Sequence, residues 1–324
     1  PYDGVPPWDQ IRPEHFPAAF QAALDAQRGE IAAIVNNRQA PTFANTIEAL
    51  ERSGRDLDRV GSLFGVMISN IGSQPYRDLD REWSPKLAQA SDEITFNTRL
   101  FRRIEAVWKK RDELTPQQKR LTERYYDSFV RSGAQLNAAQ KRELGQVNQR
   151  LATLFSEFGS KVVADENTWI VLESEADLAG LSPQLVAAAR AAAEERGLQG
   201  KWVIVNTRSS VDPFLASSTR RDLRERVWKA FKDRGDNGDA EDTNATIAEI
   251  VRLRQQRARL LGFPTHAHWR MSDTMAKDPA RAQELMARVW PAAVARVRQE
   301  VADMQAIATQ EGANITIEPW DYLF

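Results

Sequence analysis

The sequence predicts a mainly helical chain that forms an elongated array of helices with one small β element. Apolar residues recur at helical spacing along most of its 324 residues, and that spacing gives each helix one apolar face. Several helix starts are marked by a capping residue directly before a proline. Two short segments are instead rich in β-branched and aromatic residues, which favours strands.

The clearest helix is expected to begin after Asn137, a favourable N-cap residue that is followed three positions later by Gln140. Its apolar residues are spaced by threes and fours and are expected to share one face: Leu144, Val147, Leu151, Leu154, Phe155, Phe158 and Val162. Further helix starts are predicted at Thr115-Pro116, Ser182-Pro183 and Asp278-Pro279, because the first turn of a helix does not need the N–H that proline lacks.

The last long helix is expected to follow Asp278 and to end near Gly312. Pro291 lies within it and predicts a bend, since proline removes a backbone hydrogen bond. Its apolar side chains are expected to point inward: Met286, Val289, Trp290, Ala293, Val294, Val297, Val301 and Met304.

Two strands are predicted at residues 168–172 and 201–206, on either side of an alanine-rich helix that starts at Pro183. This helix is long enough for a crossover, so parallel pairing is possible, and antiparallel pairing stays open. A sheet of two strands alone is marginally stable. We therefore expect the sheet to be completed by chain that lies beyond this sequence, with Ile315-Thr316-Ile317 as a candidate for the next strand.

The composition is that of an ordinary globular protein. The hydrophobic content is 42%, the charged content is 27% and the net charge is -1, which gives no electrostatic attraction to nucleic acid or to an anionic membrane. The absence of cysteine excludes disulfides, thiolate zinc sites and a cysteine nucleophile. Cytoplasm and periplasm both fit this composition.

Histidines and acidic residues are the candidate metal ligands. His266 and His268 are two positions apart, so on a helix they point in different directions, and a catalytic zinc needs three oriented ligands. We expect them to cap and orient a helix start, and we expect His15 to be a surface or packing residue. The acidic stretch at residues 234–242 offers no register for an EF-hand and is expected to be a solvated turn.

Two predicted helices are rich in basic residues, with acidic residues interleaved. The pattern favours ion pairs over nucleic-acid binding, since no recognition motif accompanies it. A cleft that binds the C-terminal carboxylate of a peptide is the alternative, because guanidinium groups bind carboxylates in a bidentate way. The basic residues are Arg220, Arg221, Arg224, Arg226, Lys229, Lys232 and Arg234 in the first helix, and Arg252, Arg254, Arg257 and Arg259 in the second.

Residues 41–54, PTFANTIEALERSG, resemble an early helical signature of the thimet-oligopeptidase-like zinc peptidases, in their peptidyl-dipeptidase (dipeptidyl carboxypeptidase) branch. Four further groups of residues match that branch in the same order, so the resemblance covers the whole chain. Two of them, GKW at residues 200–202 and PFL at 213–215, are counted together as one group. The others are DLAGL at 177–181, RARLLGF at 257–263 and PWDY at 319–322.

The resemblance implies a two-lobed, mostly helical enzyme with a deep channel for short peptides. In this family an HExxH helix supplies two zinc ligands and the glutamate that activates the metal-bound water, and a later glutamate completes the site. This sequence contains no HExxH. No catalytic, cofactor-binding or metal residue is therefore assigned to it, and the chain alone is expected to be inactive and to bind no zinc.

The resemblance also implies a division of the chain. Residues 1–165 are expected to form a helical lid and channel wall, residues 166–312 a mixed region, and residues 313–324 the start of a catalytic lobe that is absent here. The parent protein is expected to release C-terminal dipeptides from oligopeptides. An endopeptidase of the same family is the alternative, as is a helical peptide-binding protein without catalysis. The expected partners are the catalytic lobe and short peptides, with no nucleic acid and no membrane.

Overall fold

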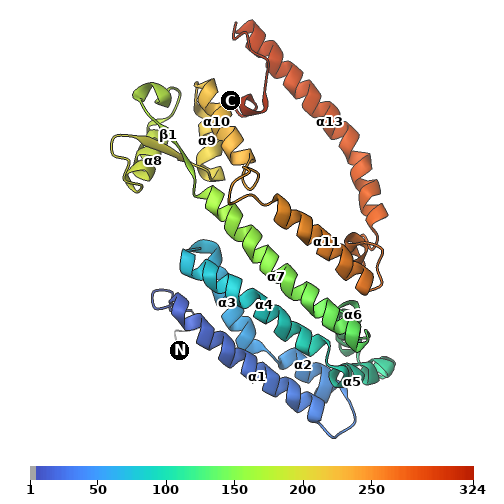
Figure 1. Ribbon diagram of the computed structural model, residues 1–324. Coiled ribbons are helices and arrows are strands. Elements are labelled where there is room, and N and C mark those ends of the chain that lie inside the picture. Colours follow the sequence, from blue (N-terminus) through green and yellow to red (C-terminus); the bar gives the residue numbers. More distant parts are fainter. Residues whose placement is uncertain (1–4) are drawn as a thin grey trace. The chain divides into compact units, whose positions relative to one another are not determined.

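The computed structural model describes residues 5–324 and confirms a mainly helical fold with one small β element (Figure 1). The chain divides into two compact units. The first unit extends to Glu157 and includes Glu249–Arg270; the second unit comprises Phe158–Ala248 and Met271–Phe324. Helices α7 (Ala138–Glu166) and α11 (Asn244–Leu260) contribute residues to both units.

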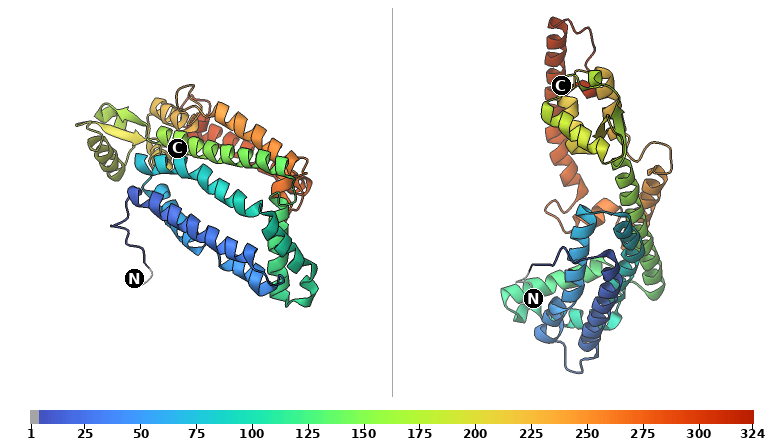
Figure 2. Two further views of the ribbon diagram at one scale, coloured as in Figure 1. Left: turned by 60° about the horizontal axis from the view of Figure 1, so that its bottom comes forward. Right: turned by 90° about the vertical axis from the view of Figure 1, so that its left-hand side faces the viewer.

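The first unit is built from helices that pack around two apolar cores. Its remaining helices are α1 (Phe16–Asn36), α2 (Ala49–Arg52), α3 (Arg55–Asn70), α4 (Gln74–Thr95), α5 (Thr98–Lys109), α6 (Pro116–Arg131) and α12 (His266–Met271). Helix α1 packs against α3, and the two lie side by side in Figures 1 and 2. One core gathers aromatic rings: Phe20 stacks on Trp83 at 5.1 Å between ring centroids and meets Phe64 edge-on at 5.5 Å.

Helix α7 begins as the sequence predicts. The side chains of Asn137 and Gln140 each accept a hydrogen bond from the other residue's backbone N–H, at 2.9 and 3.1 Å, so the two residues satisfy each other's N–H groups at the helix start. Leu144, Leu151 and Leu154 are buried. Phe155, expected on the same apolar face, is 40% exposed, and its ring lies 5.1 Å from the guanidinium carbon of Arg254.

The predicted helix starts at Thr115, Ser182 and Asp278 are also confirmed. Thr115 accepts a hydrogen bond from the backbone N–H of Gln118 at the start of α6. Ser182 caps α8 (Pro183–Glu194), and Asp278 caps α13 (Pro279–Gln310) through the N–H of Ala280 at 2.8 Å.

The second unit carries the small sheet. Strands β1 (Trp169–Leu172) and β2 (Trp202–Val205) pair antiparallel, with Trp169 opposite Val205 and Leu172 opposite Trp202. Of the two pairings that the sequence left open, the antiparallel one is therefore observed. Helix α8 packs on β2, and α9 (Arg208–Ser217) and α10 (Arg221–Lys232) complete the core of this unit.

The expectation that Ile315-Thr316-Ile317 is the next strand of the sheet is wrong. Within residues 5–324 the sheet consists of β1 and β2, and residues 315–317 bond to side chains instead. The amide of Gln305 in α13 donates to the carbonyl of Ile315 at 2.8 Å and accepts from the N–H of Ile317 at 2.9 Å. Arg221 in α10 donates to the carbonyl of Thr316 at 3.0 Å. These contacts occupy the backbone groups that a strand would offer.

Helix α13 confirms the predicted last long helix, which contains Pro291 and ends two residues before Gly312. The expectation that its apolar residues point inward is wrong for several of them. Met286 and Val289 are each 59% exposed and Trp290 is 70% exposed, while Ala308 is the buried residue of the helix. Helical spacing establishes that such residues share a face, but it does not establish what covers that face. No helix within residues 5–324 is long and apolar enough to cross a membrane.

Candidate functional site

A cleft of about 560 Å³ opens in the second unit between α10, α13 and the segment at residues 315–324. We call it the aromatic cleft, because Trp228, Phe231, Trp320 and Tyr322 line it together with Val297 and Val301 of α13. The rings of Trp228 and Trp320 meet edge-on at 5.9 Å between their centroids. Three charged residues also line it: Asp212, Lys232 and Glu318.

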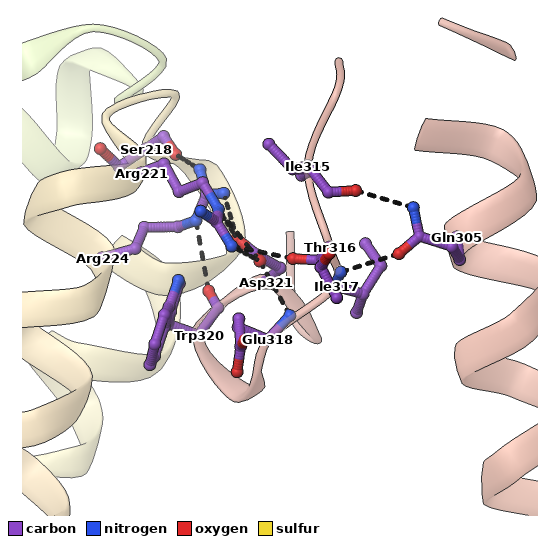
Figure 3. A network of polar contacts seen from close by, with 10 residues as sticks. All are labelled: Ser218, Arg221, Arg224, Gln305, Ile315, Thr316, Ile317, Glu318, Trp320 and Asp321. Atoms are coloured by element: carbon purple, nitrogen blue, oxygen red, sulfur yellow. Dashed lines mark hydrogen bonds and ion pairs between the residues drawn. The ribbon is translucent and has the colours of Figure 1, made fainter. Parts of the chain in front are cut away.

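The position of the segment beside the cleft is set by one buried ion cluster (Figure 3). Arg221 and Arg224 lie about one turn apart on α10, and both bind the carboxylate of Asp321 in the short helix η6 (Pro319–Asp321). Each arginine has an Nη2 atom 2.8 Å from a carboxylate oxygen of Asp321. The side chains of Arg224 and Asp321 are only 3% and 2% exposed.

Further hydrogen bonds surround this cluster. Arg224 donates to the carbonyls of Ser218 at 2.6 Å and of Trp320 at 3.2 Å, and Asp321 accepts from the N–H of Glu318 at 3.0 Å. Burial raises the pKa of Asp321, but the hydrogen bonds from Arg221, Arg224 and the N–H of Glu318, together with the charge of Arg221, outweigh burial and hold the pKa below its usual value. The carboxylate is therefore charged at neutral pH.

The chemistry of the aromatic cleft is that of an apolar contact surface. The Nε1 atom of Trp320 has no hydrogen-bond partner within the described residues. Cationic groups lie near its ring, with Lys229 Nζ at 5.5 Å and Arg221 Cζ at 5.8 Å from the ring centroid. Such a surface can hold an apolar or aromatic side chain and offer it a hydrogen-bond donor.

Most of the basic residues in and beside α10 are engaged in ion pairs, as the sequence analysis favours. Arg220 binds Asp177 and Asp222, while Arg221 and Arg224 bind Asp321; in addition, Lys229 pairs with Glu225 and Arg234 with Glu166. The alternative role of this helix, binding a peptide's terminal carboxylate, is not supported for Arg221 and Arg224, whose guanidiniums are already bonded to Asp321. The sequence analysis missed Asp321, because a contact between residues this far apart in the sequence leaves no local signal.

The three histidines lie where helices start. Thr265 lies directly before α12 and accepts a hydrogen bond from the N–H of His268 at 3.3 Å, and the His268 ring nitrogen Nδ1 lies 2.8 Å from the Thr265 hydroxyl. The Nδ1 atom of His15 accepts from the N–H of Arg12 at 3.2 Å. Across residues 5–324, no group of three or more His, Cys, Asp or Glu residues is placed to hold a metal ion.

The acidic stretch at residues 234–242 forms a turn around Asp165. The carboxylate of Asp165 is buried and accepts from the N–H of Gly235 at 2.5 Å and from the amide of Asn237 at 3.0 Å. Thr243 closes the turn by donating its N–H to the Gly235 carbonyl at 2.7 Å. The turn predicted from the sequence is thus present, and a buried acid from α7 orders it.

Comparisons with known proteins confirm the resemblance seen in the sequence. Residues 214–324 match the model of peptidase family M3. The dipeptidyl carboxypeptidase of Escherichia coli is 39% identical over 99% of this chain and 47% of its own length. The dipeptidyl carboxypeptidase of Salmonella typhimurium is 38% identical over 100% of this chain and 48% of its own length. Oligopeptidase A of Haemophilus influenzae is 26% identical over 99% of this chain and 48% of its own length. The chain spans about half the length of the curated relatives it matches.

Proposed function

We propose that this chain, a relative of the thimet-oligopeptidase-like peptidases in their peptidyl-dipeptidase branch, forms the noncatalytic N-terminal part of a zinc-dependent peptidyl-dipeptidase. The complete protein would release C-terminal dipeptides from oligopeptides. In this proposal residues 1–165 form a lid and channel wall, residues 166–312 a mixed region, and residues 313–324 lead into a catalytic lobe.

The main support for the proposal is that the chain has a higher sequence identity to one kind of relative than to the other. The chain is 39% identical to a dipeptidyl carboxypeptidase and 26% identical to an oligopeptidase A over nearly the same span. We therefore favour exopeptidase action, and an endopeptidase of the same family is the second candidate, supported by the oligopeptidase relatives.

In this proposal the catalytic lobe covers the exposed face of α13. Leu285, Met286, Val289 and Trp290 are each 59% to 70% exposed and lie within two turns of the helix. Large apolar patches of this kind are usually covered by another part of the protein or by a partner. We propose that this face is covered by the part of the protein that corresponds to the other half of the relatives.

Zinc is the metal that the family implies. The residues described here offer no cluster of three or more metal-ligating side chains, so no step of the hydrolysis is assigned to them. In the proposal the ligands and the catalytic glutamate belong to the part of the protein that matches the other half of the relatives.

The test uses a protein that joins this chain to that other half. Oligopeptides with a free C-terminus are incubated with it, and the products are weighed by mass spectrometry. We expect successive products that are two residues shorter at the C-terminus, and no such product from peptides whose C-terminus is amidated. Internal cleavage of both kinds of peptide would instead identify the endopeptidase, and cleavage of neither kind would contradict both candidates.

A further inference from the structure

A second cluster of arginines lies in the first unit, on the stretch of chain between the two groups of residues that line the aromatic cleft. Arg254 and Arg257 lie about one turn apart on α11, and Arg270 lies on α12. The guanidinium carbons of Arg257 and Arg270 are 4.6 and 5.7 Å from the ring centroid of Trp269. We call Arg254, Arg257 and Arg270 the arginine cluster.

Trp269 is held in place by the end of α6. Its indole N–H donates to the carbonyl of Arg131 at 3.0 Å, and Arg131 donates back to the carbonyl of Trp269 at 2.9 Å. The ring on which Arg257 and Arg270 rest is therefore fixed by two reciprocal hydrogen bonds. A fixed ring keeps these two guanidiniums close together, although their charges repel each other.

A cavity of about 330 Å³ lies beside the cluster and is lined by Arg257, Trp269, Asp92 and Asn148. The carboxylate of Asp92 faces this cavity from α4, but it is bonded to the amide of Asn148 at 2.9 and 3.1 Å. Arg257 reaches only the other end of that amide, at 3.5 Å from Asn148 Oδ1. The charge of Asp92 acts on Arg257, but Arg257 donates to Asn148 and not to the Asp92 carboxylate.

Three buried nitrogen atoms around the cluster have no hydrogen-bond partner within the described residues. They are Nε of Arg254, Nε of Arg257 and Nδ1 of His266. A buried polar nitrogen without a partner costs free energy, and the like charges of Arg254, Arg257 and Arg270 repel one another. Both costs disappear if an anion accepts these hydrogen bonds.

The charges of the arginine cluster act on the neighbouring titratable groups. Burial lowers the pKa of His266, and the charges of Arg254, Arg257 and Arg270 lower it further, to about 4. Burial and the two other arginines also lower the pKa of Arg257. Asp92 offsets little of this charge at low pH, because burial raises the pKa of Asp92 to about 6.

We propose that the arginine cluster, with His266 and Trp269, is a binding site for a small oxyanion such as a phosphate or a carboxylate. The planar guanidiniums suit the paired oxygen atoms of these groups. The ligand would sit at the mouth of the cavity and accept hydrogen bonds from Arg254 and Arg257. This site does not depend on the proposed peptidase activity.

The test follows the ring protons of His266 by NMR during a pH titration of the chain. The chain has only three histidines, His15, His266 and His268, so the variant His266→Gln assigns the signal. In sodium chloride His266 is expected to titrate near pH 4. In phosphate of the same ionic strength the midpoint is expected to rise to about 5 or higher, because a bound anion favours the charged imidazolium.

Variants of the cluster make the test specific. Arg270→Ala removes an exposed member and is expected to raise the His266 midpoint in chloride and to abolish most of the phosphate effect; Arg257→Ala is expected to do the same. Arg259→Ala, on the exposed side of α11, is the matched control and should behave as wild type.

At pH 7, phosphate and acetate are then compared by the increase in melting temperature that each produces over chloride, which separates phosphate from carboxylate binding.

The proposal is overturned if the His266 midpoint is the same in phosphate and in chloride. It is also overturned if Arg270→Ala and Arg257→Ala respond to phosphate as the Arg259→Ala control does. Neither result would bear on peptide cleavage, which is measured separately.

Discussion

The carboxylate of Asp321 and the guanidinium of Arg224 form an ion pair at 2.8 Å in which both side chains are almost completely buried. Arg221 binds the same carboxylate from the next turn of α10. This contact connects residues that are almost a hundred positions apart in the sequence, and it fixes the segment that lines one side of the aromatic cleft.

Removal of this carboxylate is expected to destabilise the second unit. Asp321→Ala leaves Arg224 buried without its counter-charge, which typically costs about 3 kcal/mol. The matched control is Asp222→Ala, since Asp222 pairs with Arg220 directly before α10 but its side chain is 61% exposed, where an ion pair contributes little to stability. Urea unfolding of the three proteins measures the difference. Equal losses in both variants would contradict the role given to Asp321.

The same ion cluster predicts a pH dependence. The pKa of Asp321 is lower in the folded chain than in the unfolded chain, so the stabilisation is complete above the unfolded value of about 4 and is lost as the pH falls below it. The difference in unfolding free energy between wild type and Asp321→Ala should therefore shrink in acid. A difference that stays constant from neutral pH into acid would rule out this titration.

Asp92 predicts the opposite pH dependence in the first unit. Burial raises its pKa to about 6, so its contribution to stability is complete below the unfolded value of about 4 and is lost as the pH rises through 6. Asp92→Asn should then be more stable than wild type at pH 7 by about 2 kcal/mol, since one pKa unit corresponds to about 1.4 kcal/mol and partial exposure screens the charge. At pH 4 the two proteins should have similar stability. Urea unfolding in chloride buffers at both pH values gives the comparison.

Two leucines with opposite environments test the packing of the helices. Leu100 is 0% exposed in the first unit, whereas Leu285 on α13 is 61% exposed. Leu100→Ala is expected to cost about 3 kcal/mol through lost burial and a cavity, and Leu285→Ala less than about 0.5 kcal/mol. In the protein that includes the proposed catalytic lobe, Leu285→Ala should cost substantially more. An unchanged small effect there would speak against the lobe covering α13.

Gly180 occupies a position that only glycine fits. Its φ is +87°, and an added Cβ would clash with the backbone carbonyl of Ser217. Gly197 has a similar φ of +73° but has open space around it. Gly197→Ala should therefore destabilise the protein by about 1 kcal/mol, from backbone strain alone. Gly180→Ala should destabilise it clearly more, because the clash adds to the strain. The decrease in melting temperature of each variant measures the difference. Similar shifts would show that the clash is relieved.

The features predicted correctly from the sequence are those that neighbouring residues decide. Asn137 and Gln140 cap α7 through contacts within one turn, and the strands follow from their own β-branched residues. The exposure of Trp290 and the partner of Arg224 depend on contacts between distant segments. Periodicity and composition carry no information about those contacts, so the ion cluster and the arginine cluster emerged only from the structure.

Peptide hydrolysis by this chain alone tests the proposed function most directly. The purified chain is incubated with an oligopeptide, with and without a metal chelator, and its zinc content is measured in the same sample. We expect no stoichiometric zinc and no cleavage that the chelator prevents, because the catalytic residues are proposed to lie in the other half of the protein. Chelator-sensitive turnover by residues 1–324 alone would contradict the proposal.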